Sequence, residues 1–385
     1  MANDGAKKGK VVAFPKSDTT TKIEEEPEQN TVSRNQNLDA LRGLAIILVM
    51  MGHCIVLNQM EEGIIYDAIK AIQMPLFMIA SGFTTGMMKR INTLQMLGQK
   101  IRKRAIAYLV PFVSWLLILQ WKRLPREIWD TLFQLDRGLW FLVTLFILTV
   151  IMYVAMAVKN MTPLRKAGFL GVWFLAGSLI FWQNRIGNHF LSPHLTLYYM
   201  PFYFLGNLLY RAYRIYCVWI WRRRRKIMQI NKTIIDQVLA AVTTTLLAGL
   251  FIVLIVTFDM IVANNKIELM AQMTASLCGC FLCMALIHLL PDHKCKQFLS
   301  FIGNYTLEIY VIHYHFAQIL GMADKHLSLY SFKGVGVVAL TFVIMSVLTT
   351  VSITLLKQFK ITNFLLFGKN SKARESLVDR ILGRG

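Results

Sequence analysis

The chain has 385 residues, of which 55% are hydrophobic and only 16% are charged. A soluble domain carries about 25% charged residues, so this composition excludes an ordinary soluble protein. The net charge is +21, but most of the basic residues fall between apolar segments, so they set membrane orientation and nucleic-acid binding is not indicated.

Long apolar runs dominate the sequence. Each run is about 17 to 25 residues long, which is the length that a helix needs to cross the hydrocarbon core of a bilayer. We therefore predict an all-α fold, a polytopic membrane helical bundle with about ten transmembrane helices. The predicted spans fall near residues 40–57, 66–88, 105–121, 139–158, 167–183, 195–213, 234–257, 268–290, 304–321 and 334–356.

The positions of the basic residues predict how this bundle is oriented. If the N-terminus is cytoplasmic, the segments on the inner side contain most of the lysine and arginine, as the positive-inside rule requires. Both termini are then cytoplasmic, in a multi-pass protein of the plasma membrane that contacts membrane lipids. We predict a disordered cytoplasmic tail over residues 1–33, a membrane domain over residues 34–357 and a basic cytoplasmic tail over residues 358–385.

Three ionisable residues lie in the first predicted span, namely Asp39, Arg42 and His53. At about 100° per residue, Arg42 and His53 differ by about 20° around the helix, and Asp39 lies within about 60° of both. The three side chains therefore share one face over roughly 21 Å of the helix axis. Ionisable groups at bilayer depth are costly and usually face a protein-lined cavity, so this face is a candidate pathway or reaction site.

The second predicted span contains a proline and a pair of small residues. Pro75 is expected to kink the helix and free a backbone carbonyl, and Ser81 followed by Gly82 permits the close approach of another backbone. Breaks of this kind are tolerated at membrane depth where they line a cavity. Ser81 is therefore a candidate substrate contact.

A basic cluster follows the second span, formed by Lys100, Arg102, Lys103 and Arg104. Its charge density at the cytoplasmic mouth of the bundle suits an anionic, phosphate-bearing ligand. Orientation of the chain in the membrane explains the same charges equally well. The longer basic run at residues 222–226 is better explained by orientation alone.

Two later spans supply further candidate substrate contacts. Trp140 opens the fourth span, where it acts either as an interfacial anchor or as part of an acceptor site. The ninth span contains Glu308, Tyr310, His313 and His315, which cannot all face lipid. Each histidine either takes part in function or hydrogen-bonds a neighbouring helix, and the sequence leaves open which of the two is functional.

The six cysteines predict neither a disulfide framework nor a metal site. Cys280 and Cys283 have the CxxC spacing, but they lie in a continuous apolar helix with no second pair. We interpret them as small residues that pack between helices, and we expect no metal cofactor.

Several of these motifs, taken in order, resemble those of the acyltransferase-3 family of integral-membrane acyltransferases. Arg42 and His53, with ten intervening residues and a preceding Asp39, resemble the signature of that family's first span. The resemblance extends over roughly residues 34–356. The further matching segments are residues 74–77 with 81–82, 139–142, 199–206 and 302–313.

This resemblance implies transfer of an acyl group, usually acetyl, from cytoplasmic acyl-coenzyme A to a hydroxyl of a surface glycan, such as a bacterial cell-envelope polysaccharide, or of a related acceptor. Acetyl-CoA would be the donor and co-substrate. His53 would be the catalytic residue, Arg42 its partner in the essential pair, and residues 100–104 the donor-side basic segment. Gln73 departs from the family pattern, because many sugar O-acetylases carry histidine there, and this leaves the acceptor open.

The residues fit this chemistry independently of the resemblance. A thioester is already activated, so the enzyme mainly has to deprotonate the attacking hydroxyl and stabilise an oxyanion. A neutral His53 suits the first task as a general base, and a covalent acyl-histidine relay is the less favoured route. Arg42 would orient the donor or pair with Asp39.

Two other classes of function are considered. A transporter or flippase for a carbohydrate or lipid-linked precursor fits the same spans and buried histidines. The enzyme is favoured because one histidine and one arginine share a helix face and the basic cluster lies on the same side of the membrane as the arginine. A non-catalytic receptor or assembly partner would tolerate substitution of His53 and Arg42. The sequence leaves open the acceptor, the acyl chain length and the oligomeric state.

Overall fold

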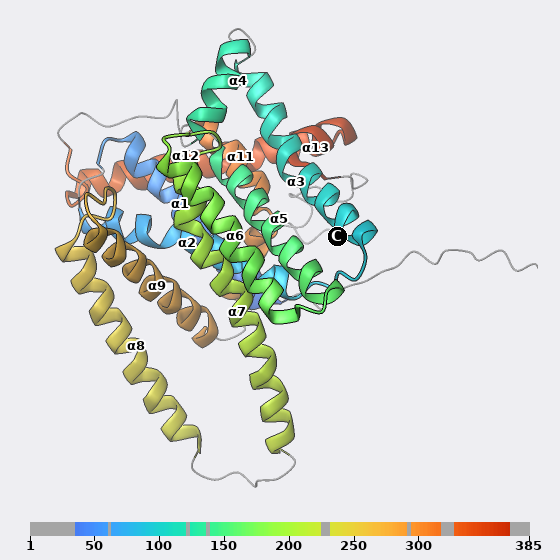
Figure 1. Ribbon diagram of the computed structural model, residues 1–385. Helices are drawn as coiled ribbons and strands as arrows, with labels where there is room; N and C mark the ends of the chain where they lie inside the picture. The colour runs from blue at the N-terminus through green and yellow to red at the C-terminus, as the bar shows by residue number, and fades with distance from the viewer. Residues whose placement is uncertain are drawn as a thin grey trace, which may run out of the picture. The chain divides into compact units, whose positions relative to one another are not determined.

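The computed structural model describes residues 35–60, 63–120, 124–135, 139–224, 232–290, 294–316 and 327–369. In these residues the chain forms helices and no strands, which confirms the predicted all-α class (Figure 1). The helices are α1 (Gln36–Leu57), α2 (Ile64–Gly86), α3 (Leu94–Gln120), α4 (Leu124–Phe133), α5 (Trp140–Met161), α6 (Arg165–Arg185), α7 (Pro193–Arg224), α8 (Lys232–Thr257), α9 (Lys266–Leu289), α10 (Lys294–Gly303), α11 (Thr306–Phe316), α12 (Phe332–Leu356) and α13 (Lys360–Phe367).

Five helices of the described chain are long and apolar enough to cross a membrane, namely α1, α2, α5, α9 and α12. The other predicted spans are also helical where they are described, as α3, α6, α7, α8 and α11. Basic residues interrupt the apolar sequence of α3 and α7, and α11 has 11 described residues. The full set of ten spans and the cytoplasmic position of both termini therefore stay predictions.

Large apolar side chains lie exposed on the outer helices. On α12, Val335, Val343 and Val351 are each at least half exposed, and on α6 the rings of Phe174 and Trp182 are mostly exposed. In water, a surface of this kind marks an interaction site, whereas a bilayer covers it with hydrocarbon. Together with the five apolar helices, this surface identifies a helical membrane protein.

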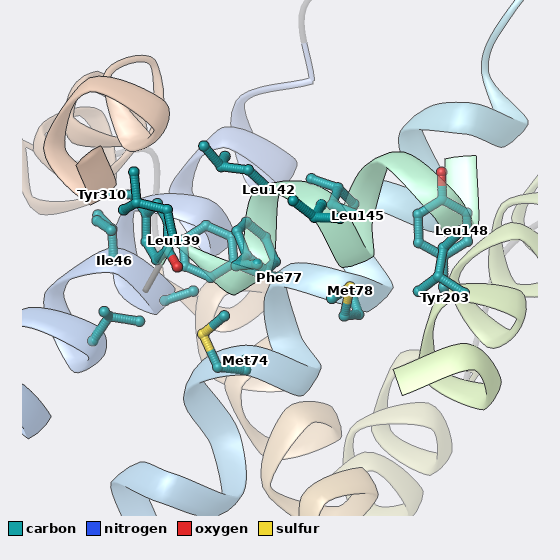
Figure 2. Packing of buried hydrophobic residues seen from close by; sticks show 14 of the residues in the cluster. Ile46, Met74, Phe77, Met78, Leu139, Leu142, Leu145, Leu148, Tyr203 and Tyr310 are labelled. Atoms are coloured by element: carbon teal, nitrogen blue, oxygen red, sulfur yellow. The ribbon is translucent and has the colours of Figure 1, made fainter. Parts of the chain in front are cut away.

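The main core lies where α2 and α5 meet, between α1, α7 and α11. Figure 2 shows Met74, Phe77 and Met78 of α2 beside the leucines of α5, with Tyr203 at one end and Tyr310 at the other. The Phe77 ring contacts the ring of Phe141 in α5 at a centroid distance of 5.5 Å. Helix α2 continues through Pro75 without interruption. This core holds α2 and α5 against the elements that carry the candidate site.

Glycine residues allow α2 and α7 to cross at backbone contact. A Cβ atom at Gly82 would overlap the carbonyl oxygen of Tyr203 in α7, and a Cβ atom at Gly206 would overlap the carbonyl oxygen of Ile79 in α2. Each glycine thus faces the backbone of the opposite helix, which is the role of small residues in membrane helix packing. The sequence predicted this close approach from the two consecutive small residues, Ser81 and Gly82.

Helices α1 and α10 cross in the same reciprocal way. A Cβ atom at Gly43 would overlap the backbone carbonyl of Leu299, and a Cβ atom at Gly303 would overlap the carbonyl oxygen of Asp39. The crossing places the first turns of α1, which carry Asp39, directly against the C-terminal end of α10. Two of the motifs that resemble the acyltransferase-3 family therefore contain packing glycines.

Alanine at position 206 is expected to lower the free energy of unfolding by about 1 to 3 kcal/mol, because the added methyl group meets a backbone atom that cannot turn away. The measurement is the melting temperature of the purified protein in detergent. The matched control is Gly171→Ala in α6, where an added Cβ atom meets nothing within 4 Å. Equal melting temperatures for the two variants would contradict the proposed backbone contact.

Helix α13 lies within the stretch that the sequence predicted as a cytoplasmic tail. Leu366 and Phe367 of α13 are buried, and the indole N–H of Trp115 in α3 donates a hydrogen bond to the Leu366 carbonyl at 3.2 Å. The packed part of the chain therefore continues past residue 357 and through α13. Residues 370–385 and the predicted N-terminal tail, residues 1–33, lie outside the described residues.

Candidate active site

The candidate site is built around His53, near the C-terminal end of α1. Helix α11 brings His313 beside it, with 5.3 Å between the centroids of the two imidazole rings. The ring of Tyr314 lies edge-on to His53 at 5.8 Å. His313 is fully buried, and His53 is partly exposed. Two histidines that are 260 positions apart in the sequence therefore form one pair.

A hydrogen bond determines which ring nitrogen of His313 carries the hydrogen. Its Nδ1 atom lies 2.7 Å from the carbonyl oxygen of Ile309, one turn earlier in α11. A carbonyl oxygen can only accept, so Nδ1 carries the hydrogen and Nε2 carries a lone pair. Among the described residues, Nε2 has no hydrogen-bond partner. His313 thus presents an unoccupied acceptor nitrogen in a pair with His53.

His315 lies in a different environment from His313. Its ring stacks on Trp115 of α3 at a centroid distance of 4.5 Å, and neither ring nitrogen has a hydrogen-bond partner among the described residues. The two positions are separated by about 200° around the helix axis, so they face different neighbours. Of the two histidines that the sequence left open, His313 is the one that the structure pairs with His53.

Aromatic side chains connect Trp140 to the histidine pair. Trp140 stacks on Tyr199 of α7 at 5.2 Å and contacts Phe141 at 6.1 Å. Phe141 contacts Tyr310 at 5.3 Å, and Tyr310 in turn lies 6.0 Å from His313. Three of the predicted substrate contacts, Trp140, Tyr310 and His313, therefore belong to one continuous aromatic wall.

The side chain of Gln73 packs against α1 at Gly52, next to His53 in the sequence. A Cβ atom at Gly52, the residue before His53, would lie 3.0 Å from the side-chain oxygen of Gln73. This oxygen is buried and has no hydrogen-bond partner among the described residues. A buried acceptor of this kind is costly unless a ligand or water satisfies it. Gln73 therefore joins the candidate site, at the position where the sequence departs from the pattern of many sugar O-acetylases.

Arg42 lies three helical turns before His53 and ties α1 to α2. Its Nη1 atom donates to the carboxylate of Asp39 at 3.2 Å, which confirms the predicted pairing of these two residues. Its Nη2 atom donates to the hydroxyl of Thr84 in α2. That hydroxyl donates in turn to the Ala80 carbonyl at 2.7 Å. Sequence reasoning missed Thr84, because a threonine in an apolar helix gives no signal of its own.

The predicted basic cluster divides into an inner and an outer part. Arg104 points into the bundle, where its Nε atom donates to the Tyr153 hydroxyl at 3.0 Å and its Nη1 atom donates to the Tyr108 hydroxyl at 3.3 Å. Arg102 and Lys103 are exposed. The charges of Arg104 and Arg42 are close enough to interact, so two guanidinium groups converge at this end of α1.

The ammonium group of Lys100 lies close to other positive charges. Partial burial, followed by the nearby charges of Arg104, Lys103 and Lys89, lowers the pKa of the Lys100 ammonium. The contribution of these three like charges shows that positive charge is concentrated at this end of the bundle. Binding of a phosphate group by the cluster stays a prediction.

Two predicted substrate contacts lie away from the histidine pair. Glu308 is fully buried, and its carboxylate forms ion pairs with Lys357, at 3.2 Å, and with Lys369. Ser81 precedes Gly82, which packs against α7, and the Ser81 carbonyl accepts a hydrogen bond from Thr85 within α2 at 2.8 Å. Glu308 therefore links α11 to α12 and to the residues after α13, and a substrate contact by Ser81 stays a prediction.

Potential metal ligands are not clustered in the described part of the chain. No group of three His, Cys, Asp or Glu side chains there is arranged to hold a metal ion. Cys278, Cys280 and Cys283 are free thiols in α9, and the thiol of Cys280 contacts the Ile72 carbonyl of α2 at 3.9 Å.

A family model matches almost all of the residues that form this arrangement. The model of the acyltransferase-3 family, described as an acyltransferase domain, matches residues 35–357, which include the histidine pair, the two arginines and the aromatic wall. No curated protein and no solved structure shows significant similarity to the chain. The chain belongs to the acyltransferase-3 family and is a membrane acyltransferase.

Proposed function

We propose that this protein transfers an acetyl group from cytoplasmic acetyl-CoA to a hydroxyl group of a cell-surface carbohydrate or a related acceptor, at the plasma membrane. The observation that carries the proposal is the pairing of His53 with His313, whose ring centroids lie 5.3 Å apart. Arg42, at the other end of the same face of α1, and Arg104 of α3, whose charge lies close to it, support a donor whose phosphates bind there.

His53 acts as the general base in this proposal. The free Nε2 atom of His313 is available to accept a hydrogen bond from one ring nitrogen of His53 when the substrates bind, and the other nitrogen of His53 then accepts a proton. The acceptor hydroxyl gives its proton to that nitrogen, and its oxygen attacks the carbonyl carbon of the thioester. The C–S bond then breaks, and the departing sulfur takes the proton from His53. The products are an ester and free coenzyme A.

The donor binds along the face of α1 that carries Arg42. Arg42 and Arg104, with Lys100 nearby, offer charge to the phosphate groups of coenzyme A, and the arm of the donor extends toward His53. The separation of Arg42 and His53, roughly 16 Å along the helix, suits an extended arm between the phosphates and the thioester.

The acceptor binds against the aromatic wall beside the histidine pair. The rings of Trp140 and Tyr310 offer flat apolar faces, on which the C–H face of a sugar ring stacks, and the unpaired oxygen of Gln73 accepts a hydrogen bond from a sugar hydroxyl. Glutamine in place of histidine at position 73 thus contributes to the choice of acceptor in this proposal.

The test uses the purified full-length protein in nanodiscs with acetyl-CoA. The expected result is release of free coenzyme A thiol that increases when a carbohydrate acceptor extract is added. A transporter or flippase would release no thiol under any of these conditions, and that result would overturn the proposal. A receptor would likewise leave acetyl-CoA intact.

Lysine at position 42 is expected to raise the KM for acetyl-CoA by about 10-fold or more while kcat falls less. A single ammonium group cannot hold Asp39 and Thr84 at the same time and still face the donor, as the guanidinium of Arg42 can. The measurement is the initial rate of thiol release as a function of acetyl-CoA concentration.

The matched control for this variant is Arg185→Lys, at an exposed position in the last turn of α6. It should leave both kinetic constants unchanged. If Arg42→Lys behaves like this control, Arg42 does not face the donor, and the proposed position of the phosphates is wrong.

A further inference from the structure

A pocket of about 540 Å³ opens where the C-terminal ends of α2 and α5 meet the second half of α7. It lies outside the cluster at residues 100–104 that the sequence singled out. We call it the basic pocket, because five of its lining residues are positively charged: Lys89, Arg90, Lys159, Arg211 and Arg214. These residues come from three segments, residues 89–104, 159–166 and 211–232, that the positive-inside rule places on the cytoplasmic side.

The walls of the basic pocket are held in place by specific contacts. The guanidinium group of Arg211 lies 4.3 Å above the centroid of the Phe169 ring, which fixes its orientation. The side-chain amide of Asn160 donates to the Ile91 carbonyl at 3.2 Å and so fixes the segment that follows Arg90. Orientation in the membrane requires basic residues only on one side of the bilayer. It does not require that they surround a hollow.

The composition of the pocket points to a ligand with a phosphate group. No acidic side chain is among the described residues that line it. Arginine binds phosphate through paired N–H donors, and several arginines around one hollow favour a multiply charged anion. The remaining lining includes Met88, Met156 and Tyr210, which suit an organic group attached to that anion. The volume lies within the range of small-molecule sites, about 300 to 1,000 Å³.

We propose that the basic pocket binds a phosphate-bearing ligand, through Arg90, Arg211 and Arg214 in particular. Two sources have this chemistry, namely the phosphates of a soluble nucleotide and the headgroup of an anionic phospholipid. The pocket also has a connection to the candidate site. The Tyr153 hydroxyl, which accepts from Arg104, donates to the sulfur of Met88 at 3.1 Å, and Met88 lines the pocket.

The test measures binding to the full-length protein in nanodiscs and does not depend on acyl transfer. One arm titrates adenosine 3′,5′-bisphosphate by calorimetry in nanodiscs of phosphatidylcholine, and the same titration of Arg42→Lys separates binding at the donor site proposed above from binding at the basic pocket. The other arm measures retention of phosphatidylglycerol by native mass spectrometry. The variants are Arg211→Gln with Arg214→Gln, on α7, and separately Arg90→Gln, on another segment. The control is Lys166→Gln with Arg185→Gln, at exposed positions of α6 outside the pocket.

The expected result is that both pocket variants weaken one of the two probes at least 10-fold, while the control variant binds as the wild type does. Weaker binding of the bisphosphate alone identifies a nucleotide ligand, and weaker retention of the lipid alone identifies a lipid ligand. If folded pocket variants bind both probes as tightly as the control variant does, the proposal is overturned. Arg90→Gln lies outside the helices, so it keeps the test valid if the α7 variant fails to fold.

Discussion

Glutamine at position 53 is expected to lower kcat for acyl transfer by about 100-fold to 10,000-fold, which is the usual contribution of a positioned general base. Glutamine is similar in size to histidine and retains a hydrogen-bonding group beside His313, but its amide does not take up a proton at neutral pH. The KM for acetyl-CoA should change little, because Arg42 lies three turns away. Rates of thiol release at saturating acetyl-CoA provide the measurement.

The matched control is His288→Gln, at an exposed position in the last turn of α9. This variant should keep the full wild-type rate. If His53→Gln folds normally and keeps more than a tenth of the wild-type rate, His53 is not the general base. The role would then have to be sought elsewhere in the site, with His313 as the first candidate.

Glutamine at position 308 is expected to lower the free energy of unfolding by about 2 to 3 kcal/mol. Removal of one partner from a buried ion pair costs about 3 to 5 kcal/mol, because it leaves the other charge without compensation. Glu308 is 0% exposed, but the side chains of Lys357 and Lys369 are 26% and 37% exposed, so water reduces the cost. Thermal unfolding of the purified protein in detergent provides the measurement.

The control for this variant is Glu268→Gln in the first turn of α9. Glu268 is partly exposed, and among the described residues its carboxylate accepts hydrogen bonds from neighbouring groups at Asn264 and Asn265. This substitution should cost less than about 1 kcal/mol. A Glu308→Gln variant that is as stable as Glu268→Gln, but that binds acceptor poorly, would restore Glu308 to the substrate contacts that the sequence predicted.

Much of the candidate site is local, and the sequence was sufficient to predict that part. Helical periodicity placed Asp39, Arg42 and His53 on one face of α1, because residues within one helix have fixed angular positions. The pairing of Arg42 with Asp39 follows from their spacing of three residues, and the structure confirms it. The basic residues from 100 to 104 were found because they stand in an apolar sequence.

Contacts between helices could not be predicted from the sequence in the same way. The choice between His313 and His315 depends on which face of α11 meets α1, and nothing in the periodicity of α11 decides this. The partners of Glu308 are Lys357, which follows α12, and Lys369, which follows α13, so these contacts form only once the chain has folded back. The role of Lys369 was missed for this reason.

The boundaries of the domain and the count of spans depend on apolar length, which is a weaker guide where charges interrupt a helix. Helix α13 has only eight residues, so it is too short to read as a span, and its packing against α3 was not predicted. In contrast, Gly82 was expected to permit close backbone approach, and it does so against α7. A glycine predicts a close contact at its own position, whereas the length of an apolar run predicts only that the helix can cross a membrane.

The most direct test of His53-dependent acyl transfer is mass spectrometry of cell-surface carbohydrates. Three kinds of cell are compared, namely cells that lack the gene, cells that carry the wild-type gene and cells that carry His53→Gln at matched protein levels. We predict that only the wild-type gene adds a base-labile acetyl ester to a surface carbohydrate. Identical ester content in all three, or restoration of the ester by the His53→Gln variant, would contradict the account.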